Sequence, residues 1–191
     1  MSLISDRVPP QSKDAEQSVL GSMIIDREAI FSAAELLVEQ DFYSTAHQKV
    51  YDGIIALSEK GEPVDLVTLS EELQRSGALE EIGGRAYLVT LANAVPTAAN
   101  VQYHARIVRE KSILRSLIQA ATGIVTRSFD SPHNVDEFLD EAEQLIFEIG
   151  KRGKQQGFAS LKEVLVDAFD RIEKLYDEKK GVTGISTGFT D

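Results

Sequence analysis

The chain has 191 residues, 42% hydrophobic and 27% charged, which is the balance of a globular protein with a core rather than a disordered one. Cysteine is absent, which excludes disulfides and cysteine-based zinc sites, and no secretory signal or ~18-residue apolar span occurs, so we expect a soluble cytoplasmic protein without a membrane partner. The net charge of -11 argues against DNA binding by this stretch, because affinity for phosphate backbones depends on lysine and arginine.

Residues 1–97 are predicted to form a compact helical head. Apolar residues recur at three- and four-residue spacing, and the alternating pattern of strands is missing. Glycine turns and Pro96 separate the short helices. Four residues of the type that caps helix N-termini precede predicted helices, namely Ser12, Asp26, Ser44 and Asp65.

A helical hairpin is predicted at about residues 98–150, and it completes a helical domain at 1–150. One long helix is predicted from 98 to 129, with two adjacent apolar stripes. Together they are wider than the ~100° apolar stripe of a helix that packs against one neighbour, so this helix should contact two. Asn134 and Glu137 form a capping box for a second helix, which should pack antiparallel to the first. The stripe left over predicts pairing with a second copy of the chain, through Ile113, Leu117, Phe138 and Leu145.

A linker region is predicted at residues 151–181. The basic, glycine-rich string GKRGKQQG at 150–157 is typical of a flexible linker. An amphipathic helix follows at 161–180, and we expect it to dock on a neighbouring subunit or a further domain, the alternative being the head itself. Residues 182–191 lack the features that close a domain, so we expect the protein to continue. The docking face contains Leu161, Leu165, Ala168, Phe169, Ile172 and Tyr176.

We predict no catalytic, cofactor-binding or metal-binding residue in these 191 residues. A phosphate-binding loop requires glycines followed by Gly-Lys-Ser/Thr, and no such string occurs. His47, His104 and His133 lack a second histidine or a carboxylate at metal-ligand spacing, so structural or solvated roles are expected. These absences favour a module for assembly and binding over an enzyme.

Several long strings, in colinear order over nearly the whole chain, resemble the N-terminal part of the bacterial replicative DNA helicases of the DnaB family. Such a colinear match is more specific than a single short motif. The strings are PPQSKDAEQSVLGSMI at 9–24, DFYSTAHQKVYDGI at 41–54, GEPVDLVTLSEEL at 61–73, LEEIGGRAYLVTLANAVPTAANVQYHARIVREKSILRSLI at 79–118 and TGISTGFTD at 183–191.

The resemblance implies an all-α fold in which a helical head and hairpin precede a linker helix and a RecA-like ATPase domain. Six copies would form a ring, with the N-terminal domains paired through their hairpins into a collar and the linker helix packed on the neighbouring motor domain. The primase, DnaG, would dock on this collar, and a helicase loader is a further implied partner.

The resemblance also assigns the chemistry to a motor domain that these residues do not include. The full-length protein would use ATP and Mg to unwind DNA at the replication fork and would hold single-stranded DNA through that domain. We expect 182–191 to lead into it, and we expect the present chain to be inactive alone and to need no cofactor. The alternative is a free-standing helical adaptor that oligomerises and recruits partners without a motor.

Three residues are predicted to contact primase. Tyr87 belongs to the head, whereas Ile118 and Ile124 belong to the hairpin. Ordinary core packing is the alternative role for each of them.

Overall fold

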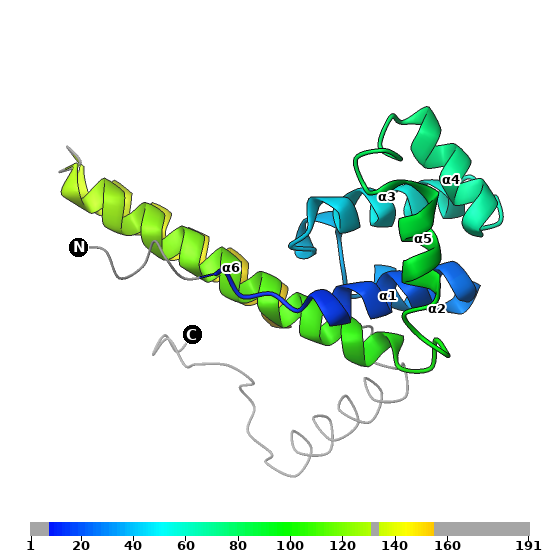
Figure 1. Ribbon diagram of the computed structural model, residues 1–191. Helices are drawn as coiled ribbons and strands as arrows, with labels where there is room; N and C mark the ends of the chain where they lie inside the picture. The colour runs from blue at the N-terminus through cyan, green and yellow to red at the C-terminus, as the bar shows by residue number, and fades with distance from the viewer. Residues whose placement is uncertain (1–7, 131–133, 155–191) are drawn as a thin grey trace, which may run out of the picture. The chain divides into compact units, whose positions relative to one another are not determined.

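The computed structural model describes residues 8–130 and 134–154, which belong to the first of two compact units, Met1–Gln155. These described residues form helices and no strand, which confirms the predicted all-helical class (Figure 1). The predicted linker helix, its docking face and the lead-in at 182–191 lie outside them. The elements are α1 (Lys13–Ile25), α2 (Arg27–Ala34), the 3-10 turn η1 (Glu39–Asp41), α3 (Thr45–Glu59), α4 (Leu66–Arg75), α5 (Gly84–Ala92), α6 (Val101–Phe129) and α7 (Val135–Lys154).

The predicted N-caps stand at the starts of their helices. The side chains of Asp26, Asp65 and Asn134 accept backbone N–H bonds from the first turn, at 2.8 to 3.2 Å. Such bonds satisfy donors that the helix itself leaves free. Ser12 and Ser44 occupy the N-cap positions of α1 and α3, but their hydroxyls make no capping bond.

The cap at Asp65 predicts a pH response. Hydrogen bonds from the backbone N–H groups of Thr68 and Val67 hold the pKa of Asp65 below its ordinary value. Because the folded pKa is depressed, this stabilisation of α4 is complete above the ordinary pKa of about 4 and is lost as the pH falls through the folded value. We expect the NMR shifts of both amides to titrate with a midpoint below 4, and Asp65→Asn to abolish the step. A midpoint at the ordinary value would contradict the assignment.

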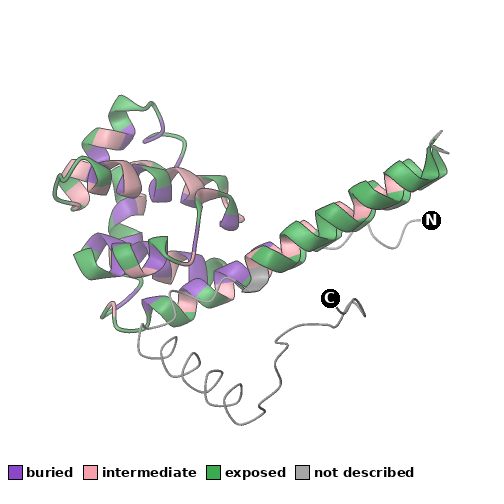
Figure 2. Ribbon diagram, turned by 180° about the vertical axis from the view of Figure 1, so that it is seen from behind, coloured by how far each residue is buried: buried purple, intermediate pink, exposed green. Residues whose placement is uncertain are grey.

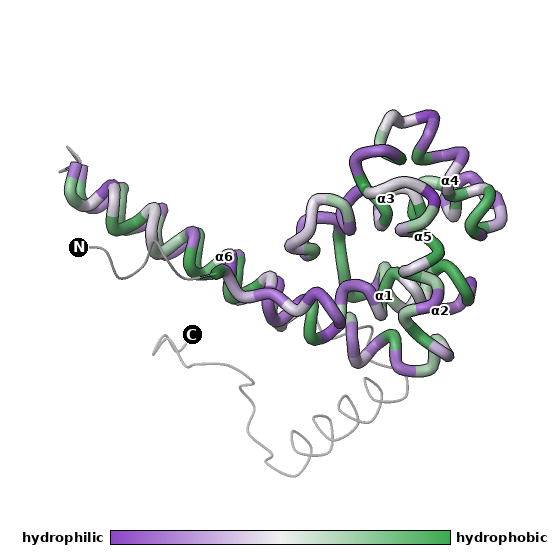
Figure 3. Tube along the Cα trace, in the orientation of Figure 1, coloured by the Kyte–Doolittle hydropathy of each residue, from purple (hydrophilic) through white to green (hydrophobic). Residues whose placement is uncertain are grey.

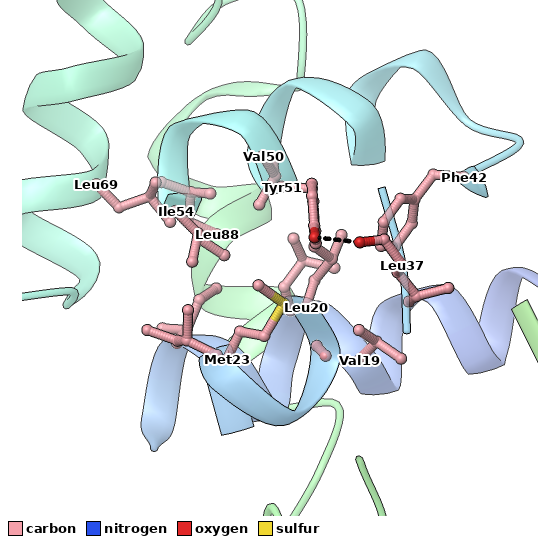
Figure 4. Close-up of a cluster of buried hydrophobic side chains, with 14 of the residues drawn as sticks. Val19, Leu20, Met23, Leu37, Phe42, Val50, Tyr51, Ile54, Leu69 and Leu88 are labelled. Atoms are coloured by element: carbon pink, nitrogen blue, oxygen red, sulfur yellow. Dashed lines mark hydrogen bonds between the residues drawn. The ribbon is translucent and has the colours of Figure 1, made fainter. Parts of the chain in front are cut away.

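Helix α1 is the centre of the head, where it packs against α2, α3, α5 and α6. Figure 4 shows labelled side chains from α1, α3, α4, α5 and the segment between α2 and α3 directed toward one another, with the Tyr51 hydroxyl donating to the Leu37 carbonyl at 2.7 Å. Burying such apolar side chains is the main stabilising contribution to the fold. The large, fully buried apolar side chains are Leu20, Met23, Leu37, Phe42, Ile54, Leu57, Leu69, Leu73, Leu88 and Leu91.

Helices α1 and α5 approach each other closely at Gly21. A Cβ at this position would overlap the carbonyl oxygen of Leu91 and would lie 3.2 Å from Cγ2 of Val95. The absence of a side chain therefore sets the separation of the two helices.

The predicted antiparallel hairpin is present as α6 and α7. Arg127 pairs with Glu141 near the turn, and the guanidinium of Arg109 donates to the Arg152 carbonyl at the other end, so the helices run in opposite directions. The first part of α6 buries apolar side chains in the head, but beyond Ser112 no described residue of either helix is buried (Figure 2).

Two boundaries differ from those predicted. Helix α6 begins at Val101 rather than at 98. Helix α7 continues to Lys154, so the first five residues of the predicted flexible string, 150–154, are helical. Contacts of Arg152 with the head and with α6 hold this last turn, although interior glycines disfavour a helix.

Candidate partner-binding surfaces

Large apolar side chains are exposed along both helices of the hairpin. Figure 3 shows these hydrophobic positions recurring along α6 beyond the head. Exposed large apolar side chains that gather into a patch are typical of a protein–protein interface. The exposed set, which we call the hairpin stripe, contains Leu114, Leu117, Ile118, Val125 and Phe129 of α6 and Val135, Leu139, Leu145, Ile146 and Phe147 of α7.

The four predicted pairing residues divide between the surface and the interior of the hairpin. Leu117 and Leu145 are 36% and 47% exposed and belong to the hairpin stripe. Ile113 and Phe138 are half-buried, and the Phe138 ring lies 4.7 Å from the guanidinium of Arg127. Leu117 and Leu145 therefore expose more apolar surface to solvent than Ile113 and Phe138 do.

The three predicted primase contacts do not form one compact site. Tyr87 is half-buried in α5. Ile118 is 46% exposed, whereas Ile124 is half-buried six residues further along the same helix. That separation corresponds to about 9 Å along α6 and about 120° around it.

Tyr87 belongs to a polar network that joins three helices of the head. Its hydroxyl lies 2.7 Å from Nε2 of His47, and Nδ1 of His47 lies 2.6 Å from a carboxylate oxygen of Glu16. The other oxygen of Glu16 accepts the backbone N–H of Tyr43 at 2.8 Å. Glu16 and His47 are 1% and 2% exposed.

The order carboxylate, imidazole, hydroxyl is the order of a nucleophilic triad, but the hydroxyl here is the phenol of Tyr87, and Glu16 and His47 are both buried among the helices. The network instead fixes α1, α3 and α5 against one another. His47 therefore has a structural role, as predicted, whereas its partners were not predicted because Glu16 lies 31 residues away in the sequence.

A groove of about 840 Å³ lies beside the base of the hairpin. Arg115 organises one wall, because its two terminal nitrogens donate to the carbonyls of Pro10 and Asp41, at 2.9 and 2.6 Å, and its guanidinium lies 5.8 Å from the Tyr43 ring centroid. The mixture of apolar and amide side chains suits a peptide segment or an apolar side chain of a partner. The lining residues are Val8, Pro9, Pro10, Gln40, Phe42, Tyr43, Gln48, Arg115, Ile118 and Gln119.

Within residues 8–130 and 134–154, no three acidic or histidine side chains are placed to hold a metal ion. The same residues contain no helix that is long and apolar enough to cross a membrane.

Comparison with known proteins identifies relatives along the whole chain. The family model described as "DnaB-like helicase N terminal domain" matches residues 8–110. Replicative DNA helicase DnaC of Bacillus subtilis (strain 168) is 47% identical over 189 residues, and Replicative DNA helicase DnaB of Geobacillus stearothermophilus is 49% identical over 189 residues. Each alignment covers 99% of this chain, which spans 42% of the length of either relative.

Two solved structures extend the likeness to the fold. The crystal structure of the N-terminal domain of DnaB helicase from Mycobacterium tuberculosis matches with a TM-score of 0.71 and 47% identity, over 74% of this chain and 99% of that one. A DnaB-like replicative helicase, studied with its interactions with primase, matches with a TM-score of 0.64 and 28% identity, over 93% of this chain and 39% of that one. The family model covers more than half of the residues, and the fold agrees, so the chain belongs to the DnaB-like helicase N-terminal domain family.

Proposed function

We propose that this chain is the collar domain of a hexameric replicative helicase, where it pairs with a second copy and docks primase. The relatives that carry the name replicative DNA helicase are more than twice as long, which supports a motor domain beyond these residues. That domain would use ATP and Mg to unwind DNA and would hold the single strand, and a helicase loader would be a further partner. The observation that carries the proposal is the hairpin stripe.

The hairpin stripe supports pairing of two copies. A standard interface buries about 800 Å² on each partner and has an apolar centre. The exposed apolar side chains recur on both helices, so each hairpin offers apolar surface that a second copy could cover. We place Leu117 and Leu145 at the contact, with Ile113 and Phe138 supporting them.

Pairing is tested by absolute mass from light scattering at about 10 μM, a concentration at which interfaces of standard size are usually populated. We expect a dimer or a larger even assembly, and Leu117→Glu with Leu145→Glu should shift it to monomer, because a carboxylate cannot be buried unpaired at an apolar contact. Gln144→Glu adds one negative charge at an exposed polar position beside Leu145 and should leave the mass unchanged. A monomeric unsubstituted chain would refute the pairing.

Primase docking is supported by the DnaB-like helicase that was studied together with primase. We propose that Tyr87, Ile118 and Ile124 contribute to this surface, with Ile118 at the groove as the most accessible of them. Addition of the C-terminal domain of the cognate primase should increase the scattered mass, and Ile118→Ala should weaken the complex without loss of helicity. Unchanged affinity in the folded variant would remove Ile118 from the surface.

Tyr87 requires two variants, because its hydroxyl is part of the head network. Tyr87→Phe keeps the ring and removes the bond to His47, whereas Tyr87→Ala removes both. A primase contact through the ring predicts that only Tyr87→Ala loses affinity. Equal loss in the two variants would indicate an indirect effect through the head.

A further inference from the structure

Arg152 ties the last turn of α7 to the head. Its Nη2 donates to Oδ1 of Asp41 at 2.8 Å, across 111 positions of sequence. Its backbone carbonyl accepts a hydrogen bond from the guanidinium of Arg109 in α6. Arg152 is therefore held at the end of α7 by two contacts, one through its side chain and one through its backbone carbonyl.

Asp41 is a carboxylate that requires a cationic partner. It is 2% exposed, and its Oδ2 accepts the backbone N–H of Val38 at 2.9 Å, which closes η1. Burial, and secondarily the negative charge of Asp41, raise the pKa of Tyr51 to about 12. A buried charge is strongly destabilising unless it is paired. The guanidinium of Arg152, whose side chain is partly exposed, is the cationic partner of Asp41.

The contact with Asp41 is the polar connection between α7 and the part of the chain that precedes α6. In the described residues, the other side-chain hydrogen bonds and ion pairs of α7 stay within the helix or reach α6. Lys151 pairs with Glu148 one turn earlier, and Glu141 pairs with Arg127 of α6. Packing against α6 holds most of α7, and among the described side chains it is Arg152 that holds the end of the helix to the head.

We propose that the Arg152–Asp41 ion pair is a latch that fixes the exit of the chain from α7 against the head. While the pair is closed, the chain leaves the hairpin from an anchored point. When the pair opens, the last turn of α7 is released while the head core and the α6–α7 packing remain. The residues concerned are all in this chain, so the latch does not depend on the proposed function.

The latch also borders the groove. Arg115 donates to the main-chain carbonyl of Asp41 and to that of Pro10, so it contacts both η1 and the segment that precedes α1. Displacement of η1 would therefore move both the carboxylate that Arg152 binds and one wall of the groove.

The test is hydrogen exchange of the 191-residue chain with Arg152→Ala, Asp41→Asn and the control Lys151→Ala. The control removes the same charge one residue away, where the partner Glu148 lies in the same helix. Asparagine at 41 retains an oxygen that can accept the Val38 N–H, so the second variant keeps η1 closed. We expect the amides of the last turn of α7 to exchange about tenfold faster in both latch variants, because local opening becomes less costly.

The amides of α1 and α3 should change less than those of the last turn of α7 in both latch variants, and least in Asp41→Asn, which leaves no buried carboxylate unpaired. The control should match the unsubstituted chain. A second measurement uses the absence of cysteine. Spin labels at Glu62→Cys and Lys154→Cys, the latter at the last residue of α7, should give a broader distance distribution with Arg152→Ala than without it. Equal exchange in Arg152→Ala and Lys151→Ala would overturn the latch. An unchanged last turn in Asp41→Asn would overturn it as well, even if Arg152→Ala failed to fold.

Discussion

Replacement of Gly21 by alanine is expected to lower the free energy of unfolding by about 3 kcal/mol, at the upper end of overpacking effects. The added methyl group would overlap the carbonyl oxygen of Leu91, which belongs to the backbone of α5 and cannot rotate away. The two helices would have to separate, and the apolar side chains around them would lose contact. Urea unfolding followed by circular dichroism measures the change.

Gly53→Ala is the matched control for this substitution. A Cβ at Gly53 would lie 3.1 and 3.2 Å from terminal atoms of Leu73 and Leu69, which are flexible side-chain ends. Alanine also favours a helix over glycine by about 1 kcal/mol. We expect Gly53→Ala to change stability by about 1 kcal/mol or less in either direction. Equal losses at both positions would show that close approach at Gly21 does not determine the spacing of α1 and α5.

Glu16→Ala is expected to destabilise the head by about 3 to 5 kcal/mol, the range for breaking a buried polar pair. The substitution leaves the Tyr43 N–H and Nδ1 of His47 without their buried acceptor. It also opens a cavity in α1, the helix on which the head is built. Thermal and urea unfolding should both report the loss.

Tyr87→Phe measures how much of this loss of stability comes from the hydrogen bond between Tyr87 and His47. It removes one hydrogen bond to His47 and keeps the ring, so a loss of about 1 kcal/mol is expected. If Glu16→Ala cost no more than Tyr87→Phe, the carboxylate would not be the centre of the network.

The features that could be predicted from the sequence are those determined by residues close to one another along the chain. Helix positions follow from apolar spacing, and the caps at Asp26, Asp65 and Asn134 follow from side chains that reach only two or three residues ahead. The turn glycines Gly61 and Gly77 have positive φ values, a conformation that glycine adopts at little cost.

The features that escaped prediction join residues far apart in the chain. The bonds from Glu16 to His47 and from Arg152 to Asp41 span 31 and 111 positions, and no local pattern marks their partners. Composition even misdirected the interpretation of 150–154, because a basic, glycine-rich string is typical of a linker. The groove likewise forms only when residues 8–10, η1 and α6 come together in the folded chain.

The central place of α1 has a consequence for synthesis on the ribosome. One of its partners, α6, begins at Val101, about 75 residues after α1 ends at Ile25. At roughly 5 to 20 residues per second, roughly 4 to 15 s pass before α6 starts to follow α1 out of the ribosome. During that interval α2, α3 and α5 can cover only part of α1, and the nascent head remains open on the α6 side. This side of α1 is therefore where we expect a chaperone to protect the newborn chain.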